Sequence, residues 1–229
     1  MLFTVLAVVL GLLPGFAWLV FYLTDDPHPE PKRLILFTFL AGIAFGFFAV
    51  VAERLLTGAL GGFGVEQFSI ISLIGLALIE EFIKFAAAYF SINRTPEMSD
   101  PVDPMLYCIV AALGFATLEN IGTLATAGTA ASGGAILTAL QTILFRFVGA
   151  TLLHSLTSGI VGYQWSLGIA KHRAASFVVA GLIFATITHA AFNELIVTAS
   201  NIGWAVLFLL VVGFFVLNDF EKLKAEEKA

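Results

Sequence analysis

The stretch LFTVLAVVLGLLPGFAWLVFYL, residues 2–23, contains no charged residue over its whole length. About 20 consecutive apolar residues are enough to cross the hydrocarbon core of a bilayer as an α-helix. The stretch also lacks the positively charged start and the small-residue cleavage site of a secretory signal peptide. We therefore expect a retained transmembrane helix, and a chain that folds within a membrane.

The overall composition agrees with a membrane protein. Hydrophobic residues make up 59% of the 229 residues and charged residues only 12%, whereas soluble domains carry about 25% charged residues. The net charge of −5 is small, and no basic cluster is long enough to indicate nucleic-acid binding. We expect the lipid bilayer as the surroundings, and neither a nucleic acid nor a nucleotide as a partner. The single cysteine, Cys108, excludes an intrachain disulfide.

Long apolar runs separated by polar, proline-containing segments define the predicted helices. The runs cover approximately residues 2–23, 34–51, 68–91, 105–126, 147–170, 174–198 and 202–217. The predicted fold class is therefore all-α, a polytopic transmembrane helix bundle of about seven spans. Residues 136–170 continue without a strong break for about twice the length of one crossing. Either one long tilted helix, or an interfacial piece at about 134–145 followed by a crossing, would fit.

The positions of lysine and arginine predict the orientation of the bundle. If the N-terminus is outside, the inside loops and tail hold eight basic residues and the outside loops hold only Arg54. The eight are Lys32, Arg33, Arg94, Lys171, Arg173, Lys222, Lys224 and Lys228. We therefore expect the N-terminus outside and the C-terminus inside. We expect a single transmembrane domain at 1–217, a catalytic core at 68–198 within it, and a short charged cytoplasmic tail at 218–229.

Ionisable and amide side chains interrupt four of the predicted spans. An ionised side chain at the centre of a bilayer costs roughly 2.5–3.5 kcal/mol even on lenient insertion scales. The residues are Glu80, Glu81 and Lys84 in the third span, Glu119 and Asn120 in the fourth, His154 in the fifth with Arg146 at its outer edge, and His189, Asn193 and Glu194 in the sixth. Intramembrane groups of this kind face the interior of a bundle and mark functional sites.

Helical spacing predicts which of these side chains share a face. Glu80 and Lys84 are four residues apart, so they can form an ion pair that lowers the cost of insertion. Glu81 points about 100° away from Glu80, so only one of the two adjacent glutamates can face a given partner squarely. His189 and Asn193 are likewise four residues apart and share a face.

The depths of these residues in the membrane also agree. At about 1.5 Å rise per residue, Glu80, Glu119, His154 and His189 fall within roughly 10 Å of one another in depth. This level lies somewhat outside the bilayer midplane. A plainer structural interpretation exists for each residue alone, since histidines and asparagines tie helices together and Glu194 can reach the nearby interface. The coincidence of all of them at one level predicts a site.

Carboxylates and imidazoles at one level suit the activation of water. A carboxylate removed from water can act as a base, and a histidine beside an amide can hold an oxyanion or protonate a leaving amine. Alternatively, two histidines and one glutamate match a catalytic zinc site with an open position for water. Glu119, His154 and His189 are the predicted ligands in that case. Both chemistries are hydrolytic, and the HExxH, GxSxG and GxGD signatures of other proteases are absent from the sequence.

Four short motifs occur in order along these spans. They are Glu80-Glu81-x-x-Lys84, Phe115-x-x-x-Glu119-Asn120, a histidine at 154, and His189-x-x-x-Asn193. Over about residues 80–193 the series resembles that of the PrsW-type intramembrane proteases. That family is related to the type II CAAX prenyl endopeptidases, whose pattern is EExxxR, FxxxH and HxxxN. Here lysine replaces the arginine with one residue less spacing, and Glu119-Asn120 stands where the relatives have histidine, so both departures point to the PrsW branch.

The resemblance implies an intramembrane hydrolase of a prokaryotic plasma membrane. Its substrate would be a membrane-anchored protein, such as an anti-sigma factor, cut in the outer half of the bilayer. By the same resemblance Glu80 or Glu81 would activate water, and His154, His189 and Asn193 would complete the site. The family is often classed with metalloproteases, which makes Zn²⁺ the expected cofactor, whereas its relatives have been argued to be glutamate proteases without a metal. Both mechanisms stay open at this point.

Two other classes of protein compete with the protease. A non-catalytic scaffold would keep the same polar residues for packing, although the Glu80-Glu81 pair has no evident use there. A proton-coupled transporter would use Glu80, Glu119 and the histidines as a relay. The absence of an internal repeat, and of prolines within the third to sixth spans, counts against a transporter.

Overall fold

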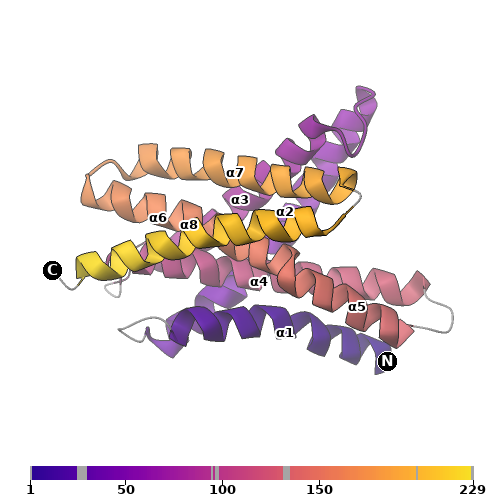
Figure 1. Cartoon of the computed structure of the whole chain (residues 1–229), viewed down its shortest axis with the longest axis horizontal. Helices are drawn as coiled ribbons and strands as arrows, with labels where there is room; N and C mark the ends of the chain where they lie inside the picture. The colour runs from indigo at the N-terminus through magenta and orange to yellow at the C-terminus, as the bar shows by residue number, and fades with distance from the viewer. Residues whose placement is uncertain are drawn as a thin grey trace.

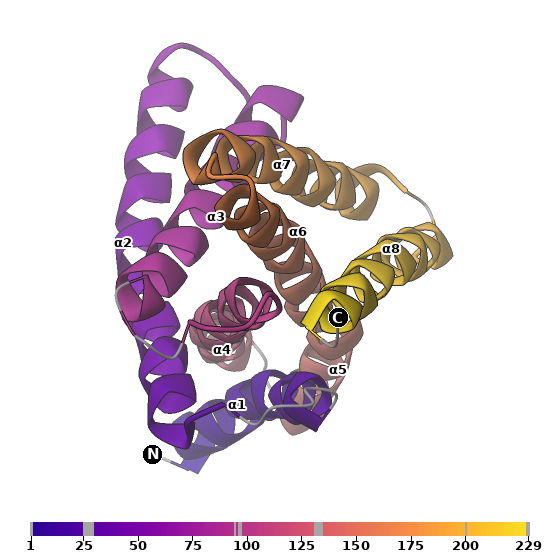
Figure 2. The same cartoon turned by 90° about the vertical axis from the view of Figure 1, so that its left-hand side faces the viewer.

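The computed structural model describes residues 2–24, 30–93, 95, 98–130, 135–199 and 201–227. These residues form eight α-helices and no strand (Figures 1 and 2). The helices are α1 (Leu2–Thr24), α2 (Lys32–Gly62), α3 (Ile70–Ile92), α4 (Asp103–Ala130), α5 (Ala135–Val148), α6 (Ala150–Ala170), α7 (Ala174–Thr198) and α8 (Gly203–Glu227). The start of α1 and the end of α8 lie at opposite ends of the bundle (Figure 1). The predicted all-α membrane bundle is confirmed.

Six stretches of the described helices are long and apolar enough to cross a membrane. They lie in α1, α2, α4, α5 with α6, α7 and α8. The third predicted span, 68–91, corresponds to α3, which has 23 residues but carries three charged side chains in its middle. The orientation of the bundle stays a prediction, and Arg94 and Lys228, which contributed to it, lie outside the described residues.

The long stretch at 136–170 contains two helices that meet at Gly149. The Trp18 indole donates a hydrogen bond to the carbonyl of Phe147, with a nitrogen-to-oxygen distance of 3.0 Å. This bond gives a partner to a backbone group beside the break, as membrane helices require. A Cβ atom at position 149 would lie only 2.7 Å from the Phe145 carbonyl oxygen, so the junction favours glycine. The single long helix is therefore excluded, and the structure has a shorter piece, α5, followed by α6, which is long enough to cross the membrane. The interfacial position of the shorter piece stays a prediction.

α4 occupies the centre of the bundle (Figure 2). It packs against α1, α2, α3, α5 and α6, and residues 105–113 are almost completely buried. Small residues let the backbones of α2 and α4 approach closely. A Cβ atom at Gly42 would lie 2.0 Å from the Ala111 carbonyl oxygen, and one at Gly114 would lie 2.0 Å from the Phe39 carbonyl oxygen. The central helix therefore fixes the positions of its neighbours, which carry the candidate site.

Two helices are longer than the predicted spans. α2 continues to Gly62 rather than ending near 51, and α8 continues to Glu227 through the predicted tail. In α8, Phe220 and Leu223 are buried in the hydrophobic core, so the tail is packed as well as charged. The reason is that charged side chains end an apolar run without ending a helix, because Glu, Lys, Arg and Leu all favour helical backbone.

Candidate active site

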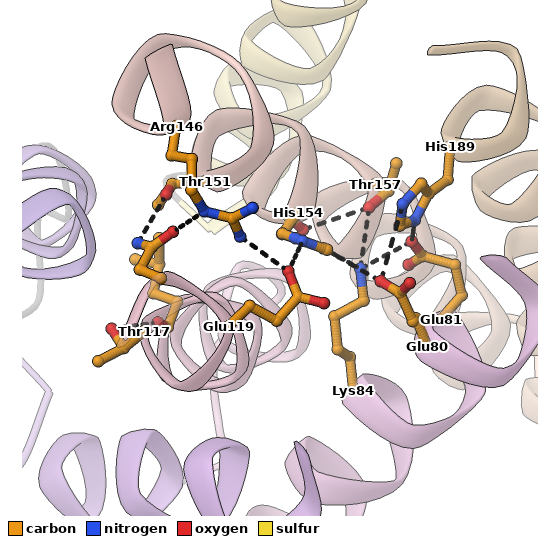
Figure 3. A network of polar contacts seen from close by, with 12 residues as sticks. Glu80, Glu81, Lys84, Thr117, Glu119, Arg146, Thr151, His154, Thr157 and His189 are labelled. Atoms are coloured by element: carbon orange, nitrogen blue, oxygen red, sulfur yellow. Dashed lines mark hydrogen bonds and ion pairs between the residues drawn. The ribbon is translucent and has the colours of Figure 1, made fainter. Parts of the chain in front are cut away.

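Four helices bring polar side chains together inside the bundle. α3 and α6 each contact the other three of the helices α3, α4, α6 and α7, and Figure 3 shows the polar side chains that meet there. Ligand-type atoms of Glu80, His154 and His189 all lie within 4.8 Å of one another. All three side chains are buried, with exposed fractions of 9%, 2% and 3%. The three predicted site residues therefore meet, from three different helices.

The ring of His189 lies between the two adjacent glutamates of α3. Its Nδ1 atom is 2.6 Å from Glu81 Oε1, and its Nε2 atom is 3.7 Å from Glu80 Oε2. The hydrogen bond to Glu81 fixes the orientation of the ring, and Nε2 then points toward Glu80. Glu81 thus faces the histidine at hydrogen-bond distance and Glu80 does not, as the spacing of the two residues predicts.

The ring of His154 is held in a similar way from the other side. Its Nε2 atom is 2.9 Å from Glu119 Oε2, and its Nδ1 atom is 3.8 Å from Glu80 Oε2. The two imidazoles meet edge to face, with ring centroids 5.2 Å apart. Each histidine therefore has one nitrogen bonded to a glutamate of its own and the other facing Glu80.

Lys84 is fully buried beside this group. Its ammonium lies 2.7 Å from Glu81 Oε1, 3.1 Å from His154 Nδ1 and 3.3 Å from Thr157 Oγ1. The predicted ion pair between Glu80 and Lys84 is therefore wrong, because Lys84 pairs with Glu81 at a spacing of three residues. Spacings of three and four are both in reach on a helix, and the Glu80 side chain is directed at the histidines instead.

Arg146 joins the network from α5. Its Nη2 atom is 3.0 Å from Glu119 Oε2, and its Nε atom donates to Asn120 Oδ1. The amide of Asn120 in turn donates to Thr151 Oγ1, at 3.1 Å. Figure 3 shows Arg146 and Glu119 on one side of His154, and the α3 residues with His189 on the other. Arg146 was predicted at the interface, and the break in the helix brings it to the site.

Asn193 has a different position from the one its motif suggests. It follows His189 by one helical turn, but among the described residues its side chain makes no hydrogen bond to the catalytic candidates. It lines a neighbouring cavity together with Arg146. Its predicted catalytic role stays a prediction.

Glu53 is an acidic neighbour that the sequence reasoning missed. It lies on α2, close enough to Glu119 and Glu80 for their charges to interact. The predicted second span ended at residue 51, so Glu53 was assigned to a loop. The helix-favouring composition of residues 52–60 was the signal that could have kept it in the bundle.

The geometry around Glu80 can accommodate a metal ion if the Lys84 ammonium, 3.1 Å from His154 Nδ1, moves away from that nitrogen. Within the described structure, Glu80 Oε2 is buried and has no hydrogen-bond partner, although it faces a nitrogen of each histidine. The opposite nitrogens are bonded to carboxylates, an arrangement typical of histidines that bind metals. The structure thus groups Glu80, and not the predicted Glu119, with His154 and His189. Glu119 lies on the side of the His154 ring opposite Glu80, and its hydrogen bond to Nε2 orients the ring.

A cavity of about 600 Å³ lies beside the network, between the α5–α6 junction, α7 and α8. Arg146 and Asn193 are the polar side chains of its described lining, and the other lining residues are apolar. The cavity is therefore a hydrophobic space with two polar groups, on the side of His154 where Arg146 lies.

Comparison with known proteins relates the chain to one family. A model of the PrsW family of intramembrane metalloproteases matches residues 30–218. The chain is 27% identical to Protease PrsW of Geobacillus kaustophilus, over 93% of this chain and 90% of the relative. It is 25% identical to Protease PrsW of Bacillus subtilis, over 94% of each chain. No solved structure was found to match it.

Proposed function

Because the chain belongs to the PrsW family of intramembrane metalloproteases, we propose that it hydrolyses its substrate at the group formed by Glu80, His154 and His189. The family makes the chain an integral membrane hydrolase that acts on a protein. The proposed substrate is a membrane-anchored protein such as an anti-sigma factor, cut in the outer half of a prokaryotic plasma membrane. The observation that carries the proposal is the buried Glu80 Oε2, which faces two histidine nitrogens without a hydrogen-bond partner in the described structure.

We propose Zn²⁺ as the cofactor, held by Glu80, His154 and His189. Two histidines and one glutamate form a known ligand set of catalytic zinc, and a bound zinc ion makes water nucleophilic near neutral pH and polarises carbonyl groups. The charges nearby support a divalent cation. Glu53, Glu81 and Glu119 lie near the group in addition to Glu80, and a bound cation would favour the ionised form of each carboxylate. Uncompensated charge is costly inside a membrane.

Glu81 is the proposed base. Its Oε1 atom is bonded to His189 and Lys84, while its Oε2 atom is buried without a hydrogen-bond partner among the described residues. Oε2 would accept a proton from the attacking water as oxygen adds to the carbonyl carbon of the substrate. The proton then passes to the amide nitrogen as the C–N bond breaks, which gives a new carboxylate and a new amine.

The test is cleavage by the purified protein in proteoliposomes. The wild-type protein would be reconstituted with a membrane-anchored anti-sigma factor of the same organism, and the products read by mass spectrometry. We expect a cut in the outer half of the membrane segment, and none with Glu80→Gln or His189→Ala. Glu194→Ala is the control, because Glu194 lies outside the network, and it should cleave at the parental rate. Parental cleavage by His189→Ala would refute the proposed site.

A further inference from the structure

The cavity beside the network is connected to both histidines of the site by short steps. Arg146 reaches from its lining to Glu119, at 3.0 Å, and Glu119 reaches His154, at 2.9 Å. Asn193, the other polar residue of the lining, is one helical turn from His189. The cavity is thus separated from His154 by the side chains of Arg146 and Glu119, and from His189 by one helical turn.

We propose that this cavity binds the substrate residues next to the bond that is cut, and that it selects apolar side chains there. This inference rests on the proposed function and adds a specificity site to it. Apolar residues such as Phe145, Phe192 and Leu209 receive the side chains. Arg146 and Asn193 bind the backbone carbonyls of the same segment.

The size of the cavity determines the form in which the substrate binds. A membrane-spanning helix about 10 Å across and 30 Å long fills roughly 2,400 Å³, about four times the 600 Å³ available. The cavity therefore accepts a short stretch and not a whole span. A bond in an intact helix is shielded by its own turns, so the stretch beside the cut is unwound when it binds.

Unwound backbone in a membrane needs hydrogen-bond partners from the protein, and the cavity offers them. The hydrogen bonds of Arg146 in the described structure use Nε and Nη2, which leaves Nη1 as a donor. The amide of Asn193 makes no hydrogen bond among the described residues, so it can also donate. A lipid acyl chain would fill the apolar part of the cavity equally well, but it has no acceptor for hydrogen bonds from a guanidinium and an amide.

A pair of defined peptides tests the selection. Each is a Lys-flanked Leu/Ala transmembrane peptide of about 20 residues with a Gly-Ser-Gly segment in its outer third, followed by leucine in one peptide and by alanine in the other. We expect the wild-type protein to cleave the leucine peptide about ten times faster, because a hydrophobic pocket discriminates by about that factor or more for lost methylenes.

Filling the cavity should remove this preference. Ala205→Phe and Val206→Phe put a ring into the space from α8, whereas Val211→Phe adds the same ring to the exposed face of α8 away from the lining. We expect the preference to fall to about onefold in Ala205→Phe and Val206→Phe, with cleavage of the alanine peptide retained, and to stay at about tenfold in Val211→Phe. The same preference in all three variants, or its loss in all three, would overturn the cavity as the specificity site.

A second measurement does not depend on cleavage. The leucine would be replaced by a benzoylphenylalanine photocrosslinker, and the peptide bound to the inactive Glu80→Gln variant. Crosslinks confined to residues 144–150, 192–196 and 202–209 support the cavity, and crosslinks spread over the outer face of α8 at 210–215 refute it. If the wild-type protein cleaves neither peptide, the proposed function loses support while the crosslinks still decide the binding site.

Discussion

Two lysines show how strongly burial affects the contribution of an ion pair to stability. Lys84 and Lys222 each lie 2.7 Å from a carboxylate three residues away, Glu81 and Asp219 respectively. The lysine side chain is fully buried in the first pair and 53% exposed in the second. Removing one partner of a buried pair costs about 3–5 kcal/mol, while an exposed pair contributes about 0–1 kcal/mol.

Replacement of the buried lysine should therefore destabilise the protein strongly. We expect Lys84→Met to lower the free energy of unfolding by about 3–5 kcal/mol, and Lys222→Met to leave it almost unchanged. Thermal unfolding in detergent, followed by tryptophan fluorescence, measures both. Equal effects would mean that the Lys84 pair contributes no more than a surface contact.

Glu81 should control the metal affinity through the ring of His189. Loss of a carboxylate that orients a metal-binding histidine typically lowers affinity 10–100-fold, and we expect Glu81→Gln to lower zinc affinity by about this factor. Titration with a chelator of known affinity measures it. Glu194→Gln on α7 is the matched control and should bind zinc normally. Unchanged zinc binding by Glu81→Gln would remove Glu81 from the support of the site.

The sequence predicted much of the site at this scale. The common depth of Glu80, Glu119, His154 and His189 anticipated that they would meet, because depth follows directly from helical rise. It did not determine which glutamate pairs with Lys84, since two spacings reach the same face. The sequence also did not predict the position of Arg146, because the position depends on the angle and place at which α5 and α6 separate.

Among the helices, the junction between α5 and α6 matters most for the site, because Arg146 and His154 lie on its two sides. We expect Gly149→Ala to lower both stability and cleavage, since its Cβ would meet the Phe145 carbonyl oxygen at 2.7 Å. Gly122→Ala in α4 is the control, as nothing lies within 4 Å of a Cβ there. It should be neutral or stabilising by about 0.5–1 kcal/mol. Thermal unfolding and the peptide assay compare the two variants, and a neutral Gly149→Ala would show that the junction tolerates a side chain.

The positions of the helices followed from the sequence better than their ends did. Apolar runs located every described helix except the separate α5, because they mark the part that contacts lipid. They did not show that α2 continues past Glu53, because a charged residue ends an apolar run in the sequence even where the helix continues. The missed end of α2 is also why Glu53 was missed.

For the molecule as a whole, the proposed metal should stabilise the fold, because its ligands come together only in the folded chain. A ligand present at 100 times its dissociation constant stabilises the native state by about 2.7 kcal/mol. We therefore expect a chelator to lower the unfolding temperature and added Zn²⁺ to restore it. The Glu80→Ala/His154→Ala double variant should respond to neither. A wild-type protein that binds no zinc would leave a glutamate mechanism without a metal.

The orientation of the whole bundle can be tested with single cysteines. The native Cys108 is buried, so an added cysteine at an exposed site would be labelled selectively. With the N-terminus outside, Phe63→Cys after α2 should react with a membrane-impermeant maleimide in intact cells. Lys171→Cys between α6 and α7 should react only after permeabilisation. The reverse pattern would invert the proposed topology and place the site in the inner half.

The length of α2 links the enzyme to the thickness of its membrane. Its 31 residues extend about 46 Å, whereas the hydrocarbon core is about 30 Å thick. A bilayer adapts to such excess length by helix tilt or local thickening, and lipids with longer acyl chains would cover more of the helix. The proposed catalytic group is fixed within the bundle, so a substrate anchored by its own apolar length would meet it at a different residue. The place of the cut would then shift along the substrate as the bilayer thickens. The length of the fragments would therefore change with membrane thickness.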